Sequence, residues 1–167
     1  MSGEKQIKII EVGPRDGLQN EKKAIDVQDK ITFIDLLSQC GFPEIEAGAF
    51  VSPKWVPQMA SSEDIFQHLQ HKSQQGMTYS ALVPNLKGME KALELGVQKI
   101  CVFTAASATF NQKNINCTIQ ESIARFVPVV DLANQNDVKS GLMCRRPLFA
   151  RMKGMCLLIK CCLLCSN

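Results

Sequence analysis

Short apolar runs and helical periods alternate regularly from residue 7 to about residue 139. Four such strand–helix pairs, each roughly 30 residues long, precede a fifth strand that begins at Val138. Strands that alternate with helices predict a parallel sheet with right-handed crossovers. A doubly wound sheet could close within 167 residues, whereas a (β/α)8 barrel needs about 250 residues and at least about 200. Periodicity alone does not decide between the two.

Each expected element has a recognisable start or stop signal. Strands are expected at 7–12, at 78–83 and at 99–103, and Pro43-Glu-Ile-Glu46 starts another between the first two of these. Helices are expected after Asp26 (Val27, Ile31, Ile34 and Leu37, closing at Gly41), after Ser61 or Ser62 (Ile65, Phe66 and Leu69), after Asn85 (Met89 and Leu93, stopping at Gly96) and after a Thr118–Glu121 capping box (Ile123, Phe126 and Val130).

The composition changes near residue 140. Residues 140–167 hold five Lys or Arg, no Asp or Glu, and five of the eight Cys. The preceding residues are slightly acidic with scattered lysines, which argues against a nucleic-acid binder. The apolar run 155–165 is about half of the ~20 residues that a membrane span needs, and Lys160 interrupts it. We therefore expect neither a nucleic-acid partner nor a membrane span.

The Cys and His residues do not form a pattern typical of metal sites. Residues 1–6 resemble neither a signal nor a transit sequence, so the cysteines of the first 139 residues are interpreted as reduced thiols. The Cys161-Cys162-x-x-Cys165 run lacks a second pair at zinc-site spacing. His68 and His71 lie three apart on the second helix. We expect them on a solvated helix face.

The densest polar cluster follows the first strand, at Gly13–Asn20. The carboxyl ends of parallel strands are where barrels and open sheets handle ligands. Arg15 could stabilise an enolate or carboxylate oxygen through its fixed donors. Asp16 could give a hard oxygen ligand to a divalent cation, and Glu46 could face the same opening. The alternative is a turn whose charges face water.

Two further loops could handle ligands. The stretch Phe50–Met59 follows the second strand and contains two prolines and the only Trp, which suits either a ligand lid or a packed connection. The fourth strand leads into 105–116, where Lys113, Asn114 and Asn116 could meet phosphates or an amide chain. The alternative for 105–116 is a polar loop before the Thr118 cap.

Four segments together resemble the hydroxymethylglutaryl-CoA lyase family. They are Val12-Gly-Pro-Arg-Asp-Gly-Leu-Gln-Asn-Glu21, Phe50-Val-Ser-Pro-Lys-Trp-Val-Pro-Gln-Met59, Pro84-Asn-Leu-Lys-Gly88 and Lys113-Asn-Ile-Asn-Cys117. The resemblance covers about residues 7–139, with the motifs in order and at fitting spacing. It implies a pyruvate carboxyltransferase-like (β/α)8 TIM barrel, here only the first four to five βα units.

The resemblance also implies a reaction. Family members cleave 3-hydroxy-3-methylglutaryl-CoA to acetyl-CoA and acetoacetate, a retro-Claisen step of ketogenesis and leucine degradation that uses Mg²⁺ or Mn²⁺. By resemblance, Arg15 stabilises the enolate of acetyl-CoA, Asp16 is a metal ligand, and Glu46 and Gln19 belong to the catalytic pocket. Lys113 and Asn114 fall where the family meets CoA. The resemblance further implies an acyl-CoA substrate and a homodimer.

The chain departs from the family pattern in its last residues. The family's His-x-His pair, a metal-ligating Asn and a reactive Cys belong to later segments that this sequence does not contain. The family also carries Cys-Pro-Tyr-Glu-Gly after the fifth strand, and codons for Phe149–Lys153 read one base earlier permit that peptide. We therefore divide the chain into a barrel part, 1–139, and a divergent tail, 140–167, and hypothesise a change of reading frame near Ser140.

Three functions compete at this point. The first is the lyase, inactive as this chain alone. The second is a non-catalytic truncated product, because an open half barrel exposes sheet edges. The third is another Claisen-type barrel enzyme, such as an isopropylmalate or citramalate synthase, against which the 50–59 and 85–88 motifs argue. The family is often mitochondrial, but no transit peptide precedes the motifs, so a cytosolic location is the alternative.

Overall fold

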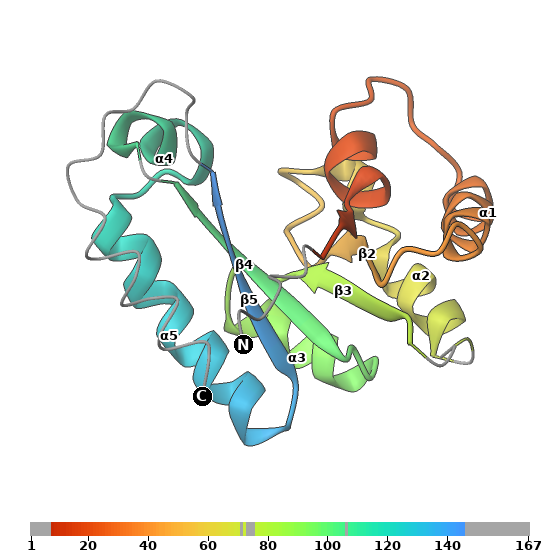
Figure 1. The fold of residues 1–167 in the computed structure, drawn as a ribbon. Helices are drawn as coiled ribbons and strands as arrows, with labels where there is room; N and C mark the ends of the chain where they lie inside the picture. The colour runs from red at the N-terminus through yellow and green to blue at the C-terminus, as the bar shows by residue number, and fades with distance from the viewer. Residues whose placement is uncertain (1–7, 71, 73–75, 106, 146–167) are drawn as a thin grey trace, which may run out of the picture.

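Five parallel strands form one sheet in the computed structural model, which describes residues 8–70, 72, 76–105 and 107–145. The strands lie in sequence order in one twisted sheet (Figure 1). The strands are β1 (Ile10–Glu11), β2 (Glu44–Ala49), β3 (Thr78–Leu82), β4 (Lys99–Ala105) and β5 (Lys139–Arg145).

Helices connect successive strands of the sheet. In Figure 1, α1 and α2 flank one side of the sheet and α5 runs along the other. The helices are α1 (Val27–Ser38), α2 (Ser62–Leu69), α3 (Leu86–Glu94), α4 (Ala108–Ile115) and α5 (Ile119–Gln135), with short helical turns η1 (Gly13–Gly17) and η2 (Pro57–Met59).

The strand order decides between the two architectures that periodicity left open. A doubly wound sheet reverses its strand order at a switch point. Here every strand pairs in parallel with the next one along the chain, from β1–β2 through β4–β5. That order is the order of a (β/α)8 barrel, and the described strands are consistent with part of one. The expectation of a partial barrel is confirmed.

The helix starts follow the predicted capping residues. Asp26 Oδ1 accepts the backbone N–H of Gln28 at 2.8 Å, and Asn85 Oδ1 accepts that of Gly88 at 3.0 Å. Thr118 and Glu121 form the predicted reciprocal capping box. Gly41 and Gly96 follow α1 and α3 with positive φ, the conformation that glycine permits at a helix stop.

The core lies between the outer face of the sheet and the helices. Alternate strand residues, among them Ile45, Ala81 and Ile100, are fully buried against helix residues such as Ile34 and Met89. The other face of the strands carries polar side chains, with Glu44 and Glu46 on β2, Ser80 on β3 and Lys99 on β4. The period of two therefore separates an apolar outer face from a polar inner face.

The structure corrects three local expectations. Residues 108–115 form α4 rather than a loop, because the hydroxyl of Ser107 accepts the backbone N–H of Phe110 at 3.3 Å and starts a helix there. Ser61 precedes α2, but its side chain makes no capping bond. The first strand is short, with only Ile10–Glu11 paired to β2.

The composition boundary near residue 140 falls inside the sheet. β5 begins at Lys139 and pairs in parallel with β4 from Lys99–Lys139 to Ala105–Arg145. Residues 146–167, which hold most of the expected tail, lie outside the described residues. No helix among the described residues is long and apolar enough to cross a membrane.

Candidate functional site

The chain winds into one wide helical turn where β1 ends. The carbonyl of Val12 accepts the backbone N–H groups of Arg15 at 3.1 Å and Asp16 at 2.7 Å. Pro14 supplies the φ that a first helical position needs. The backbone N–H of Gly13 donates to Glu11 Oε1 at 2.6 Å, which ties the start of the turn to β1. The turn thus places two adjacent charged side chains at the carboxyl end of the sheet.

Arg15 is buried, with 4% of its surface exposed, and is held from three sides. Its Nε donates to Glu46 Oε1, one terminal N–H donates to Asp16 Oδ1 at 2.8 Å, and another donates to Met143 Sδ at 3.4 Å. A guanidinium carries five N–H donors. Two of them therefore have no acceptor among the described residues. A fixed cation with unused donors is suited to stabilising an oxyanion.

The two carboxylates beside Arg15 differ in exposure. The Glu46 side chain is 1% exposed, whereas the Asp16 side chain is 48% exposed. Glu46 Oε2 is buried without a hydrogen-bond partner among the described residues. Burying a carboxylate is costly unless it is paired, so Glu46 serves as the buried anchor of Arg15. Asp16 instead offers carboxylate oxygen at the rim.

Cys101 adds an uncharged thiol beside Glu46. It lies on β4, and its neighbour across the strand pair is Leu82. Burial raises the pKa of the Cys101 thiol to about 12, and the negative charge of Glu46 adds to the effect. The thiol is therefore protonated at neutral pH, which makes Cys101 a poor nucleophile.

The structure brings together three of the six predicted site residues: Arg15, Asp16 and Glu46. Gln19 lies one turn further along the same segment and is half-buried. Lys113 is exposed in the last turn of α4, and Asn114 follows it in the same helix. The predicted CoA residues thus lie on the connection after β4.

The stretch 50–59 is packed at both ends and exposed between them. Phe50 and Met59 are buried, and the Phe50 ring packs on Phe66 with centroids 5.5 Å apart. Trp55 is 87% exposed. Neither the lid nor the packed connection describes this loop completely, because its ends are packed and its tip is exposed.

The expected solvated position of His68 is corrected. Its Nε2 lies 3.2 Å from Asp35 Oδ2 on α1, and Lys72 donates to the same oxygen at 2.6 Å. His68 therefore lies at the contact of α1 with α2. His71 lies outside the described residues.

Sequence reasoning did not single out Met143, Cys101 or Ser80, which line the same inner face. Met143 contacts Arg15 from 128 positions away, a separation that no local pattern reveals. The alternation of strand residues between the two faces could have identified Ser80 and Cys101. Ser80 pairs in register with Glu46, and Cys101 lies two residues after Lys99 and so on the same face of β4. A polar residue in a strand otherwise rich in apolar residues is such a signal.

A second buried charge lies at the opposite, amino end of the strands. Glu44 Oε2 accepts from Lys8 at 2.7 Å and from Lys99 at 2.8 Å. Burial alone would raise the pKa of Glu44, but the hydrogen bonds from the two lysines outweigh it and lower the pKa. Glu44 Oε1 and Ser80 Oγ are buried without a hydrogen-bond partner among the described residues.

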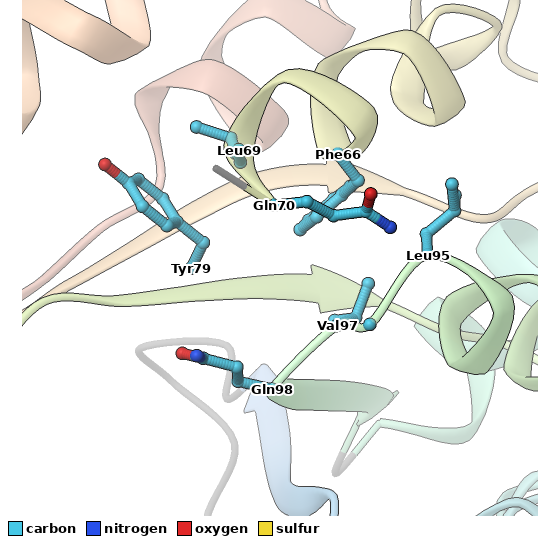
Figure 2. A pocket seen from close by; sticks show the side chains of 8 residues that line it. Phe66, Leu69, Gln70, Tyr79, Leu95, Val97 and Gln98 are labelled. Carbon is cyan, nitrogen blue, oxygen red and sulfur yellow. The ribbon is translucent and has the colours of Figure 1, made fainter. Parts of the chain in front are cut away.

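The structure also contains two cavities outside the Arg15 turn. One has a volume of about 220 Å³. It lies at the amino ends of β3 and β4, where Figure 2 shows Phe66 and Val97 pointing toward each other. Another of about 250 Å³ lies between the 50–60 loop and the start of α3. Arg15, Asp16 and Glu46 line neither cavity.

The chain is similar to known proteins over most of its length. A sequence profile described as HMGL-like matches residues 6–150. This chain belongs to the HMGL-like family. A 3-hydroxy-3-isohexenylglutaryl-CoA/hydroxy-methylglutaryl-CoA lyase of Pseudomonas aeruginosa is 56% identical over 135 residues, which are 81% of this chain and 44% of the relative. The mitochondrial hydroxymethylglutaryl-CoA lyase of Mus musculus is 51% identical over 129 residues, 77% of this chain and 39% of the relative.

Solved structures of HMGL-like proteins give the same result. The hydroxymethylglutaryl-CoA lyase from Pseudomonas aeruginosa superposes with a TM-score of 0.78 at 54% identity, covering 84% of this chain and 46% of that one. An HMG-CoA lyase from Acinetobacter baumannii, solved with coenzyme A and 3-methylmalate, gives 0.77 at 31% identity, covering 92% and 50%. The chain therefore spans about half or less of the length of the HMGL-like proteins it matches.

Proposed function

We propose that this chain carries the Arg15 half of a hydroxymethylglutaryl-CoA lyase active site. The observation that carries the proposal is the buried Arg15 guanidinium, which Glu46 anchors and which keeps two N–H donors without an acceptor among the described residues. Cleavage of 3-hydroxy-3-methylglutaryl-CoA to acetoacetate leaves the electron pair of the broken carbon–carbon bond on acetyl-CoA as an enolate. A fixed cation with free donors suits that developing charge.

Each residue of the turn has a distinct part in this proposal. Arg15 donates N–H groups to the enolate oxygen of the departing acetyl-CoA. Glu46 keeps the guanidinium from rotating, because its buried carboxylate holds Nε. Gln19 lies beside the turn and contributes to the substrate pocket. Lys113 and Asn114 on α4 are proposed to contact the CoA portion of the acyl-CoA substrate.

The carboxylate of Asp16 is the type of ligand that a divalent cation such as Mg²⁺ or Mn²⁺ prefers. Its carboxylate is half-exposed at the rim, and only one oxygen is engaged by Arg15. Hard cations prefer such oxygen ligands. The described residues contain no group of three or more Cys, His, Asp or Glu that could hold a metal ion, and Asp16 is the residue proposed here as a ligand. When bound, the cation would polarise the hydroxyl oxygen of the substrate.

A hybrid barrel tests the proposal. Residues 8–139 of this chain would replace the matched segment of the Pseudomonas aeruginosa lyase, and acetoacetate release would be measured with Mg²⁺. We expect Arg15→Met to lower kcat by about 10²-fold or more, the usual effect of losing an oxyanion donor. Arg125→Met, on the exposed face of α5, is the matched control and should change kcat less than about twofold. A folded hybrid without turnover, or equal effects of the two substitutions, would contradict the proposal.

The 167-residue polypeptide by itself is proposed to be inactive. Among the described strands, β1 and β5 each have only one neighbour, so the sheet does not close. We expect no acetoacetate above background from the purified chain with Mg²⁺ or Mn²⁺, and robust turnover would overturn this. The hypothesis of a changed reading frame is tested by the transcript across codons 135–167, and the implied homodimer by analytical ultracentrifugation of the hybrid.

A further inference from the structure

One side chain joins the loop after β2 to the segment that leaves the Arg15 turn. Gln58 Nε2 donates to the carbonyl of Glu21 at 3.0 Å and to that of Lys23 at 2.6 Å. Gln58 Oε1 accepts the backbone N–H of Ile25 at 3.4 Å. A single amide thus pairs with three backbone groups of one short segment, close to its full hydrogen-bonding capacity.

That segment has little else to hold it. Residues 20–24 are all exposed, and only Ile25 is half-buried. The segment continues directly from the turn, since Asn20 Nδ2 donates to the carbonyl of Asp16 at 2.7 Å and the N–H of Glu21 to that of Leu18 at 3.0 Å. Any displacement of residues 21–25 would therefore pull on the peptide that carries Asp16.

The Gln58 backbone is itself fixed from the other side. Lys30 on α1 is buried, and its Nζ donates to the carbonyl of Gln58 at 2.5 Å and to Ser61 Oγ at 3.1 Å. Burial lowers the pKa of Lys30, and the charge of Asp26 partly offsets that shift. The buried ammonium thus anchors the loop, and the loop carries the Gln58 side chain to residues 21–25.

We propose that Gln58 is a positioning residue for the Arg15–Asp16 turn. Its amide clamps residues 21–25 against the loop after β2, so that the turn and this loop form one rigid rim at the carboxyl ends of β1 and β2. The catalytic meaning of that rim rests on the proposed lyase function, whereas the clamp rests on the contacts above. Gln58 acts through the segment and need not touch substrate.

Hydrogen exchange of the 167-residue chain tests the clamp. Gln58→Met keeps the length of the side chain and removes its hydrogen bonds. We expect the amide of Ile25 to exchange at least about tenfold faster, as the loss of net hydrogen bonds predicts, with faster exchange also at Asp16 and Gly17. Amides of β2–β4 should change less than about twofold. Gln39→Met, which loses one exposed bond at the end of α1, is the matched control.

A second variant separates the role of the Gln58 acceptor oxygen from the role of its two N–H donors. Gln58→Glu keeps the acceptor for Ile25 but replaces both donors by a negative charge, so Ile25 should stay better protected than in Gln58→Met. Trp55, the only tryptophan of the chain, lies in the same loop, and its fluorescence anisotropy should fall in both variants.

Three results would overturn the proposal. They are wild-type exchange in Gln58→Met, acceleration confined to Ile25, and equal acceleration of the turn and the strands, which would show a global loss of stability. An inactive hybrid lyase would contradict the proposed function and leave these exchange rates unaffected, so the two failures are distinguishable.

Discussion

Replacing Glu46 by Gln removes the buried negative charge that holds Arg15. The Arg15 and Glu46 side chains are 5% and 1% exposed, so neither charge can regain water without local unfolding. Breaking a buried ion pair from one side costs about 3–5 kcal/mol, because the remaining charge stays desolvated. Gln keeps the shape and one acceptor oxygen. We therefore expect Glu46→Gln to lower the free energy of unfolding by about 3 kcal/mol, the lower end of that range.

The same guanidinium provides an internal comparison. Asp16 also pairs with Arg15, at 2.8 Å, but its side chain is 48% exposed. Exposed pairs contribute at most about 1 kcal/mol, so Asp16→Asn should cost less than that. Glu63→Gln, which breaks the exposed pair with Lys91, is a second control. Burial rather than pairing then explains any excess cost at Glu46.

Urea unfolding of the 167-residue chain, followed by circular dichroism and by Trp55 fluorescence, measures these differences. The double variant Arg15→Met/Glu46→Gln removes both charges, so it should lose less free energy than the sum of the single variants, with a coupling of about 2 kcal/mol or more. If Glu46→Gln costs no more than Glu63→Gln, or if the coupling is below about 0.5 kcal/mol, then Glu46 does not anchor Arg15.

Three further predictions concern pH and helix capping. Burial raises the pKa of the Cys101 thiol from 9.0 to about 12, so between about pH 9 and pH 12 the thiol is protonated in the folded chain and ionised in the unfolded chain. Over that range the free energy of unfolding should fall by roughly 1.4 kcal/mol per pH unit, and the difference between wild type and Cys101→Ala in urea titrations isolates this slope. The pKa of Glu44 is lowered on folding. Its contribution to the free energy of unfolding is therefore present above about pH 4.5 and is lost as the pH falls through the lowered pKa. Glu44→Gln should make the free energy of unfolding depend less on pH in this acidic range. Thr118→Ala removes half of a capping box, so it should lower the free energy of unfolding by about 1 kcal/mol and reduce the helical circular dichroism signal. An unchanged helical signal would show that Glu121 alone is enough to start α5.

The elements that sequence predicted well have strong local causes. Asp26, Asn85 and Thr118 each bond to backbone within three residues of themselves, so their capping role is visible in a short stretch of sequence. The 3.6-residue period of Ile31 and Ile34 placed the buried face of α1 correctly. In contrast, α4 follows its capping residue Ser107 in a run of small and polar residues, where the apolar period is too weak to indicate a helix.

Only some of the site residues are close to one another in the sequence. Arg15 and Asp16 are adjacent, and the Gly-Pro turn after a strand predicted that both lie at the end of that strand. Glu46 was expected where the second strand ends, but β2 (Glu44–Ala49) continues past it, and the side-by-side packing of parallel strands is what brings its inward-facing carboxylate to Arg15. Met143 reaches Arg15 from β5, and Gln58 reaches residues 21–25 from the next connection. Curvature of the sheet and the path of two loops decide these contacts, and neither has a period or motif in the sequence.

The buried polar atoms explain why the inner face demands such nonlocal contacts. Glu44, Glu46 and Ser80 each bury one oxygen without a hydrogen-bond partner among the described residues, and all three belong to the inner face of β2 and β3. Helices from adjacent segments of the chain cover the apolar outer face of the sheet. A buried oxygen, in contrast, requires a hydrogen-bond donor at a defined distance and angle. Lys8 and Lys99 meet that requirement for one oxygen of Glu44, and Arg15 meets it for one oxygen of Glu46. The Ser80 hydroxyl beside Glu44 and the Cys101 thiol beside Glu46 come from β3 and β4, so the polar contacts of the inner face join strands that are distant in sequence.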